Sequence, residues 1–216
     1  MSKRKLHKQP RDASIGIASE ESTWNPRKKY VLVTEGRVTE PDYFRYAIAD
    51  LIDDDHNTVS IEDQHNGDYK RLVAIADNAE RNSSRGETEY WILADTEQRD
   101  VSTECNDLLD WARESGHYLA LSNTMFEVWV LMHKQKPNTN SAAKSFLIEQ
   151  MRSTVVRTYS ATNKHLDKVT FAEEEVRRAI QLAGNRRNTF QTGSDKQPPN
   201  SPWNTTVDLL VKKLLR

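Results

Sequence analysis

The sequence lacks several features that would each place it in a familiar class of proteins. Its 216 residues include one cysteine, Cys105. This excludes a disulfide framework and a cysteine-rich zinc site, and it favours a reducing, cytoplasmic setting. No apolar run approaches the length of a membrane-spanning helix, so no membrane partner is expected. The formal net charge is −1, so contacts with nucleic acid must come from local basic patches.

A nucleotide-binding P-loop is also absent, because the pattern Gly-x-x-x-x-Gly-Lys-Ser/Thr occurs nowhere in the chain. What the chain does contain is an alternation of short apolar runs and helical patterns. Strands are predicted at 30–34, 58–62, 89–94 and 117–121, and helices between them at 39–51, 68–81 and 101–115. This β-α-β-α-β-α-β order favours a mainly parallel sheet flanked by helices.

The character of the chain changes after this alternation. Helices are predicted around 125–132, 141–157, 171–183 and 203–216, with a Pro-, Ser- and Asn-rich loop at 191–202. We therefore predict an α/β fold with an α-helical C-terminal portion. The expected organisation is a flexible basic arm at 1–28, an α/β core at 29–122, and a helical portion at 123–216 that packs on the core.

Two predicted strands end in carboxylates. Glu35 and Gly36 follow the first strand, and Asp95 and Glu97 follow the third. Open α/β sheets place ligands at this edge, and residues i and i+2 of an extended chain point to the same side. Neighbouring carboxylates repel each other unless a cation intervenes, and oxygen ligands suit Mg²⁺ or Mn²⁺. Local sequence leaves Glu35 open between this role and that of a helix cap or an ion-pair partner.

A third strand end meets a helix start at Ser122 and Asn123, either of which is a candidate helix cap. Glu127 follows among large apolar residues, and a buried glutamate needs a partner or a raised pKa. Asp100 either contributes to the acidic site or caps the next helix. We therefore take Asp100, Asn123 and Glu127 as supporting residues.

Basic residues gather in a few places along this nearly neutral chain. As contacts to phosphate groups they would form the rim of a nucleic-acid site, and the alternative is a solvated surface. The candidates are Lys3, Arg4, Lys5, Arg177, Arg178, Arg186 and Arg187.

Four segments resemble the RloB family, which is also represented by the abortive-infection protein AbiLii. They are Leu32–Gly36 with Thr39–Phe44, Trp91–Glu97, Leu121–His133 and Asn200–Leu215. The family is related to Toprim domains, so the resemblance implies a general acid/base glutamate, matched by Glu35, and an Asp-x-Asp pair that holds Mg²⁺. Asp95 matches the first aspartate, and Glu97, one methylene longer, stands in place of the second.

The resemblance also departs from the family pattern at two positions. Thr124 stands where proline is usual, and Met125 where cysteine is common. The predicted function is a Mg²⁺-dependent nuclease of antiphage defence that cuts RNA, such as tRNA, or DNA. Two alternatives stay open, a non-catalytic adaptor for a partner ATPase and a nucleotide-binding sensor. The sequence also leaves open whether the protein forms a homodimer.

Overall fold

The computed structural model describes residues 27–63, 69–83, 87–96, 104–137, 143–190 and 203–215. Almost all of the predicted basic arm lies outside this described part, as does the whole of the predicted loop 191–202. Five of the candidate functional residues also lie outside it, namely Lys3, Arg4, Lys5, Glu97 and Asp100.

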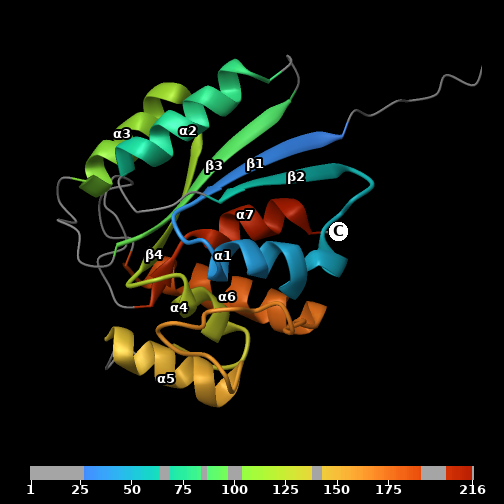
Figure 1. The fold of residues 1–216 in the computed structure, drawn as a ribbon, viewed down its shortest axis with the longest axis vertical. Helices are drawn as coiled ribbons and strands as arrows, with labels where there is room; N and C mark the ends of the chain where they lie inside the picture. Colours follow the sequence, from blue (N-terminus) through green and yellow to red (C-terminus); the bar gives the residue numbers. More distant parts are fainter. Residues whose placement is uncertain are drawn as a thin grey trace, which may run out of the picture.

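The centre of the molecule is a five-stranded sheet with the order β2-β1-β3-β4-β5 (Figure 1). The strands are β1 (Lys28–Thr34), β2 (Asn57–Asp63), β3 (Thr88–Asp95), β4 (Tyr118–Asn123) and β5 (Asn204–Thr205). The strands β1 to β4 are parallel to one another, and β5 is antiparallel to β4. The predicted α/β class with a mainly parallel sheet is therefore confirmed.

Helices cover both faces of this sheet (Figure 1). On one face lie α2 (Tyr69–Arg81) and α3 (Glu104–Ser115). Leu72 of α2 and Leu108 of α3 pack in one hydrophobic cluster with Val33, Ile92 and Leu121 of the strands. These strand residues alternate with those that face the other side, as the period of two in a strand requires.

The other face carries the larger hydrophobic cluster. Its helices include α4 (Glu127–Met132), α6 (Glu173–Phe190) and α7 (Val207–Leu214), with α5 (Lys144–Thr154) farther from the sheet (Figure 1). Leu32 and Trp91 of the sheet belong to the same cluster as Trp129, Val176 and Leu210. The sheet and the C-terminal helices thus bury their apolar side chains against each other.

The segment after β1 differs from the single helix predicted for 39–51. It forms α1 (Thr39–Asp42), a π-helix η1 (Tyr43–Ala47) and a 3₁₀-helix η2 (Ala49–Leu51). Val38 occupies the N-cap position of α1, and no side chain caps the helix. The Thr39 hydroxyl instead contacts the Tyr159 hydroxyl and the Lys164 carbonyl.

Further element boundaries differ from the predicted ones, because distant segments contact each other. The predicted cap residues Ser122 and Asn123 belong to β4, and Phe126 precedes α4 without a side-chain cap. Asn204 and Thr205, predicted as part of a helix, pair with β4 as β5. The penultimate helix is longer than predicted because α6 continues through Arg187, whose guanidinium contacts Asp208 of α7.

Candidate acidic active site

Glu35 and Asp95 lie together at the carboxyl ends of β1 and β3. These strands are neighbours, and Thr34 is in register with Leu93. The Glu35 backbone N–H donates to the Leu93 carbonyl at 3.0 Å, which extends the ladder by one bond. The Glu35 carboxylate then accepts a hydrogen bond from the backbone N–H of Asp95 at 3.0 Å. The end of one strand is therefore fastened to the end of the other through the Glu35 side chain.

Glu40 is a third carboxylate of this site, and the sequence analysis did not identify it. Its Oε1 accepts a hydrogen bond from the Gly36 backbone N–H at 3.1 Å. A Cβ atom on Gly36 would clash with the Glu40 carboxyl group. Gly36 is thus required for a close approach of the Glu40 side chain to the backbone. Its position directly after Glu35 was the available signal, since a glycine there leaves room for a nearby group.

Glu127 is the fourth carboxylate and is almost completely buried, with 1% of its surface exposed. Its Oε1 accepts a hydrogen bond from the Tyr159 hydroxyl at 2.5 Å and lies 3.0 Å from the Lys164 ammonium. The sequence indicated that Glu127 needs a partner, but it did not identify Tyr159 or Lys164. Both come from the connection between α5 and α6, where no local pattern marks them.

The four carboxylates, which we call the acidic cluster, influence one another electrostatically. Burial raises the pKa of Asp95 well above its usual value, and the charges of Glu40, Glu127 and Glu35 raise it further. Burial and the charge of Glu127 raise the pKa of Glu40 to about 7. Burial alone would lower the pKa of Lys164, but its ion pair with Glu127 raises it. Lys164 is thus held in the charged form.

These charges decide whether the acidic cluster suits a divalent cation. When Glu35, Glu40, Asp95 and Glu127 are ionised, the acidic cluster carries more negative charge than the Lys164 ammonium beside it balances. Among the described residues, the one group whose three ligand atoms lie within 4.8 Å of one another is Asp42, His165 and Asp167, outside the cluster. A tight triad is not required for Mg²⁺, which usually binds one or two carboxylates and keeps several waters. The donor set therefore fits such an ion.

The predicted basic contacts on α6 mostly have partners within the fold. Arg177 forms an exposed ion pair with Glu173 at 2.5 Å, and Arg178 donates a hydrogen bond to the His133 carbonyl at 3.3 Å. Burial lowers the pKa of Arg186. Arg187 contacts the buried carboxylate of Asp208. The guanidinium of Arg187 thus stabilises the packing of α6 on α7, and its contact with nucleic acid stays a prediction.

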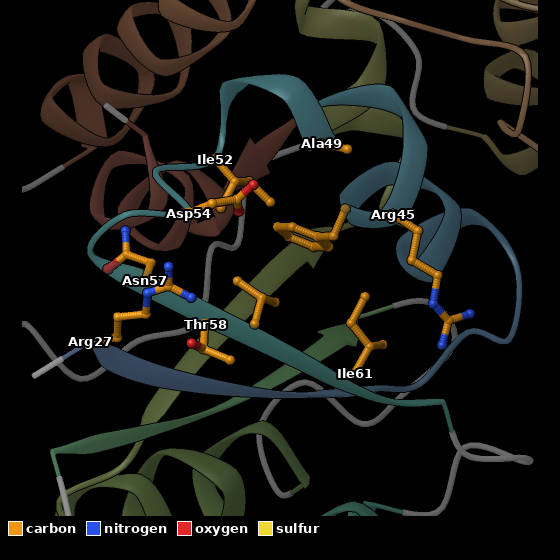
Figure 2. Close-up of a pocket in the computed structure, with 10 residues that line it drawn as sticks. Arg27, Arg45, Ala49, Ile52, Asp54, Asn57, Thr58 and Ile61 are labelled. Carbon is orange, nitrogen blue, oxygen red and sulfur yellow. The ribbon is translucent and has the colours of Figure 1, made fainter.

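A cavity of about 510 Å³ lies elsewhere, between β2 and the helices η1 and η2 (Figure 2). Its walls are apolar and polar in equal measure, with Phe44, Ile52 and Ile61 among the apolar residues, and Arg27 and Arg45 reach it from two sides (Figure 2). None of its lining residues belongs to the acidic cluster. The cavity and the carboxylates are therefore separate features of the molecule.

A comparison with protein-family models gives a match over residues 30–214 to the RloB-like protein family. The chain belongs to the RloB-like family. The match extends from β1 to the end of α7 and includes every residue of the acidic cluster, so the resemblance drawn from the sequence motifs is confirmed. Comparisons with curated proteins and with solved structures give no match. No helix in the described part of this RloB-like protein is long and apolar enough to cross a membrane.

Proposed function

We propose that this RloB-like protein hydrolyses phosphodiester bonds in RNA or DNA, with Mg²⁺ or Mn²⁺, as part of a defence against phage. The observation that carries the proposal is the hydrogen bond from the Asp95 N–H to the Glu35 carboxylate. It joins two strand ends within a cluster of four carboxylates and one ammonium group. Strongly perturbed pKa values at the edge of a sheet are typical of functional sites, and family membership supports the role in defence.

In this proposal the carboxylates have two roles, cation binding and proton transfer. Asp95 and Glu35 would hold the cation, together with Glu97 of the predicted pair. A bound divalent cation supplies a Lewis acid for the phosphate and makes water more acidic. Glu35 would also exchange the proton with the attacking water, as the resemblance implies. Glu40 is a second candidate for proton transfer, because its pKa of about 7 lets it both bind and release a proton near neutral pH.

Two residues supply features that four carboxylates alone would lack. Lys164 provides the positive charge against which a negatively charged phosphate can bind. The Tyr159 hydroxyl donates a hydrogen bond to Glu127, which fixes that carboxylate. The Lys164 ammonium keeps its remaining N–H donors for a phosphate group. Glu127 is thus proposed to place Lys164 rather than to bind the cation.

The test is cleavage of tRNA, total RNA and plasmid DNA by the full chain with Mg²⁺, with Mn²⁺ and with EDTA. Replacing Glu35 by Gln keeps its shape and removes its charge. We expect Glu35→Gln to lower the cleavage rate by about a thousandfold, within the range that general acid/base groups contribute. Glu62→Gln is the matched control, because Glu62 lies near the end of the neighbouring strand β2 and has no contact with the acidic cluster.

Two results would contradict the proposal. One is a wild-type protein that cuts none of these substrates, and the other is a Glu35→Gln variant that cuts as fast as the wild type. If Glu35→Gln and Asp95→Asn also protect cells from phage as the wild type does, the adaptor role beside a partner ATPase replaces the nuclease. Titration of the protein with nucleoside triphosphates and Mg²⁺ tests the sensor role directly.

A further inference from the structure

The connection between α5 and α6 contains a short, internally bonded turn that delivers Tyr159 and Lys164 to the acidic cluster. The Ser160 backbone N–H donates to the Asn163 carbonyl at 2.9 Å. In return, the Ser160 hydroxyl oxygen accepts a hydrogen bond from the Asn163 backbone N–H at 3.0 Å. This 159–166 segment thus has its own structure, but it must be held in place for Lys164 to reach Glu127.

Side chains of the short helix α1 hold this segment from the other side. One carboxylate oxygen of Asp42 accepts hydrogen bonds from the Leu166 backbone N–H and from His165 Nδ1, each at 3.0 Å. One helical turn earlier, the Thr39 hydroxyl contacts the Tyr159 hydroxyl at 3.1 Å and the Lys164 carbonyl at 3.4 Å. Asp42 is 7% exposed, and a buried carboxylate is costly unless it is hydrogen-bonded.

We propose that Asp42 is a positioning residue, which holds the 159–166 segment on α1 and thereby places the Lys164 ammonium at Glu127. Asp42 contacts no member of the acidic cluster in the described structure. It acts through Leu166 and His165, the two residues that follow Lys164. The consequence for cleavage rests on the proposed nuclease function, whereas the placement of Lys164 does not.

The charge of the acidic cluster explains why this placement matters. Glu127 is buried, and removing one member of a buried ion pair leaves an uncompensated charge. When the 159–166 segment is released, Glu127 loses both Lys164 and the Tyr159 hydroxyl. The four carboxylates would then face one another without a nearby cation. One hydrogen-bonded carboxylate on α1 thus controls the charge balance of a site assembled from both parts of the chain.

The experiment measures the accessibility of Lys164 in the full-length protein. An amine-reactive acetylating reagent is applied, and the modification of Lys164 is followed by mass spectrometry relative to exposed Lys168 as internal reference. We expect Asp42→Ala to raise the relative modification rate of Lys164 about tenfold, because hydrogen bonds to charged groups contribute this much to an equilibrium. Asp42→Asn keeps an acceptor for the Leu166 N–H, so its increase is expected to be smaller.

Asp53→Ala is the matched control. Asp53 forms a carboxylate–histidine pair with His56 at 2.9 Å on the surface, far along the chain from Lys164. This variant should leave the modification of Lys164 unchanged. If Asp42→Ala unfolds the protein, as seen by circular dichroism, Asp42→Asn provides the deciding measurement. Unchanged modification of Lys164 in a folded Asp42 variant overturns the positioning role.

The catalytic consequence is measured separately with the nucleic acid that the wild type cuts. We expect Asp42→Ala to lower kcat about tenfold with a smaller change in KM, because the lost group acts on charge that develops during the reaction. An unchanged kcat beside an accessible Lys164 overturns the link to catalysis. A wild type without cleavage activity overturns the proposed function, and the labelling result still decides the placement of Lys164.

Discussion

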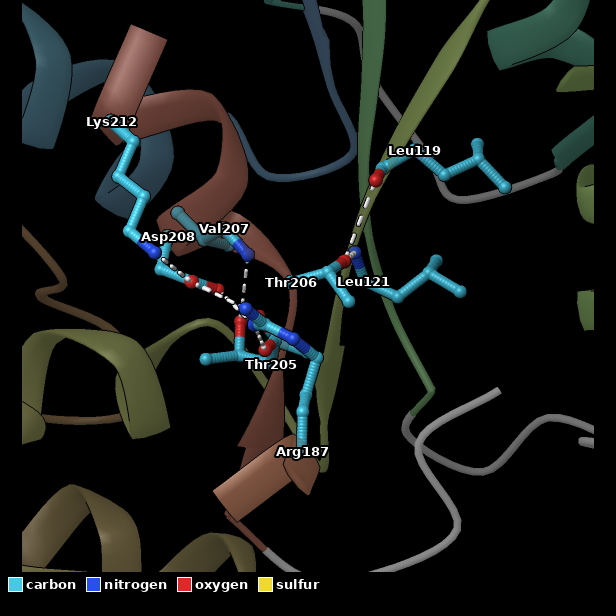
Figure 3. A network of polar contacts seen from close by, with 9 residues as sticks. Leu119, Leu121, Arg187, Thr205, Thr206, Val207, Asp208 and Lys212 are labelled. Atoms are coloured by element: carbon cyan, nitrogen blue, oxygen red, sulfur yellow. Dashed lines mark hydrogen bonds and ion pairs between the residues drawn. The ribbon is translucent and has the colours of Figure 1, made fainter. Parts of the chain in front are cut away.

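Asp208 and Glu127 are buried carboxylates that each pair with a cation, and the two pairs differ in their surroundings. Asp208 of α7 has no exposed surface and binds Arg187 of α6 through both guanidinium nitrogens, one of them at 2.7 Å from Oδ2 (Figure 3). Arg187 also donates to the Thr205 carbonyl at 3.0 Å. Lys212 lies 3.9 Å from the same carboxylate. The negative charge of Asp208 is therefore fully compensated.

Glu127 is nearly as deeply buried, but its ammonium partner, Lys164, also interacts with other carboxylates. Besides Glu127, the charges of Glu40 and Asp95 act on Lys164, and Asp95 and Glu40 both have raised pKa values. Burial and pairing are common to both carboxylates, so these two features alone do not mark a functional site. What distinguishes the acidic cluster is an excess of charge that the protein itself does not compensate, and such sites attract a ligand.

The largest expected effect on stability comes from breaking the balanced pair. Arg187→Ala leaves the Asp208 carboxylate buried and unpaired, which costs about 3–5 kcal/mol of the free energy of unfolding. Urea unfolding followed by circular dichroism measures this loss. Lys212→Ala is the control, because this half-exposed, more distant partner is expected to contribute less than about 1 kcal/mol.

The Arg187→Ala variant also tests whether Arg187 contacts nucleic acid. Arg187 is a predicted nucleic-acid contact, whereas its bonds to Asp208 and Thr205 favour a structural role. Under conditions in which Arg187→Ala remains folded, we expect its affinity for RNA and DNA to equal that of the wild type. A folded variant that has lost affinity would show that Arg187 serves both roles.

The sequence was informative where function depends on neighbouring strands. Glu35 and Asp95 each follow an apolar run, and parallel strands bring their carboxyl ends to one edge. For Glu40 the sequence offers one signal, the space left by Gly36 after the first strand. Tyr159 and Lys164 have none, because they depend on contacts with Thr39, more than 100 positions away along the chain. Helix ends were wrong where tertiary pairing overrode local preference, as at β5.

The pH dependence of stability tests the raised pKa of Glu40. The pKa of Glu40 in the folded protein is about 7, above its ordinary value of 4.5. Between these values Glu40 binds more protons in the folded protein than in the unfolded chain, so its contribution to the free energy of unfolding falls as pH rises through that window. Buried His133, whose pKa is lowered to about 4, contributes in the opposite direction. Urea unfolding of the wild type and of Glu40→Gln, in EDTA at pH 5 and pH 7.5, therefore isolates the contribution of Glu40.

Two variants sharpen the pH test. Glu40→Gln removes the titrating group, so its free energy of unfolding at pH 7.5 relative to pH 5 should be higher than that of the wild type, whereas Glu62→Gln should match the wild type. Adding Mg²⁺ at pH 7.5 should restore stability to the wild type, because a ligand that binds only the folded state stabilises it. A change in the free energy of unfolding between pH 5 and pH 7.5 that is the same in Glu40→Gln and in the wild type would contradict the raised pKa of Glu40.

The smallest expected effect on stability separates geometry from charge. Gly36→Ala places a Cβ against the Glu40 carboxyl group, which is the flexible end of a side chain and can rotate away. We expect a change in the free energy of unfolding of less than about 1 kcal/mol. Cleavage should nevertheless slow by about tenfold, because small displacements of positioned groups are costly in catalysis.

Gly184→Ala provides the control for the alanine substitution itself. Gly184 lies within α6, and a Cβ there would meet no atom within 4 Å. This variant should stabilise the protein by about 0.5–1 kcal/mol, since glycine is unfavourable inside a helix, and it should cleave at the wild-type rate. Equal cleavage by Gly36→Ala and Gly184→Ala would mean that the position of Glu40 is unimportant. Cleavage would then depend on Glu35 and Asp95, together with Glu97 of the predicted pair.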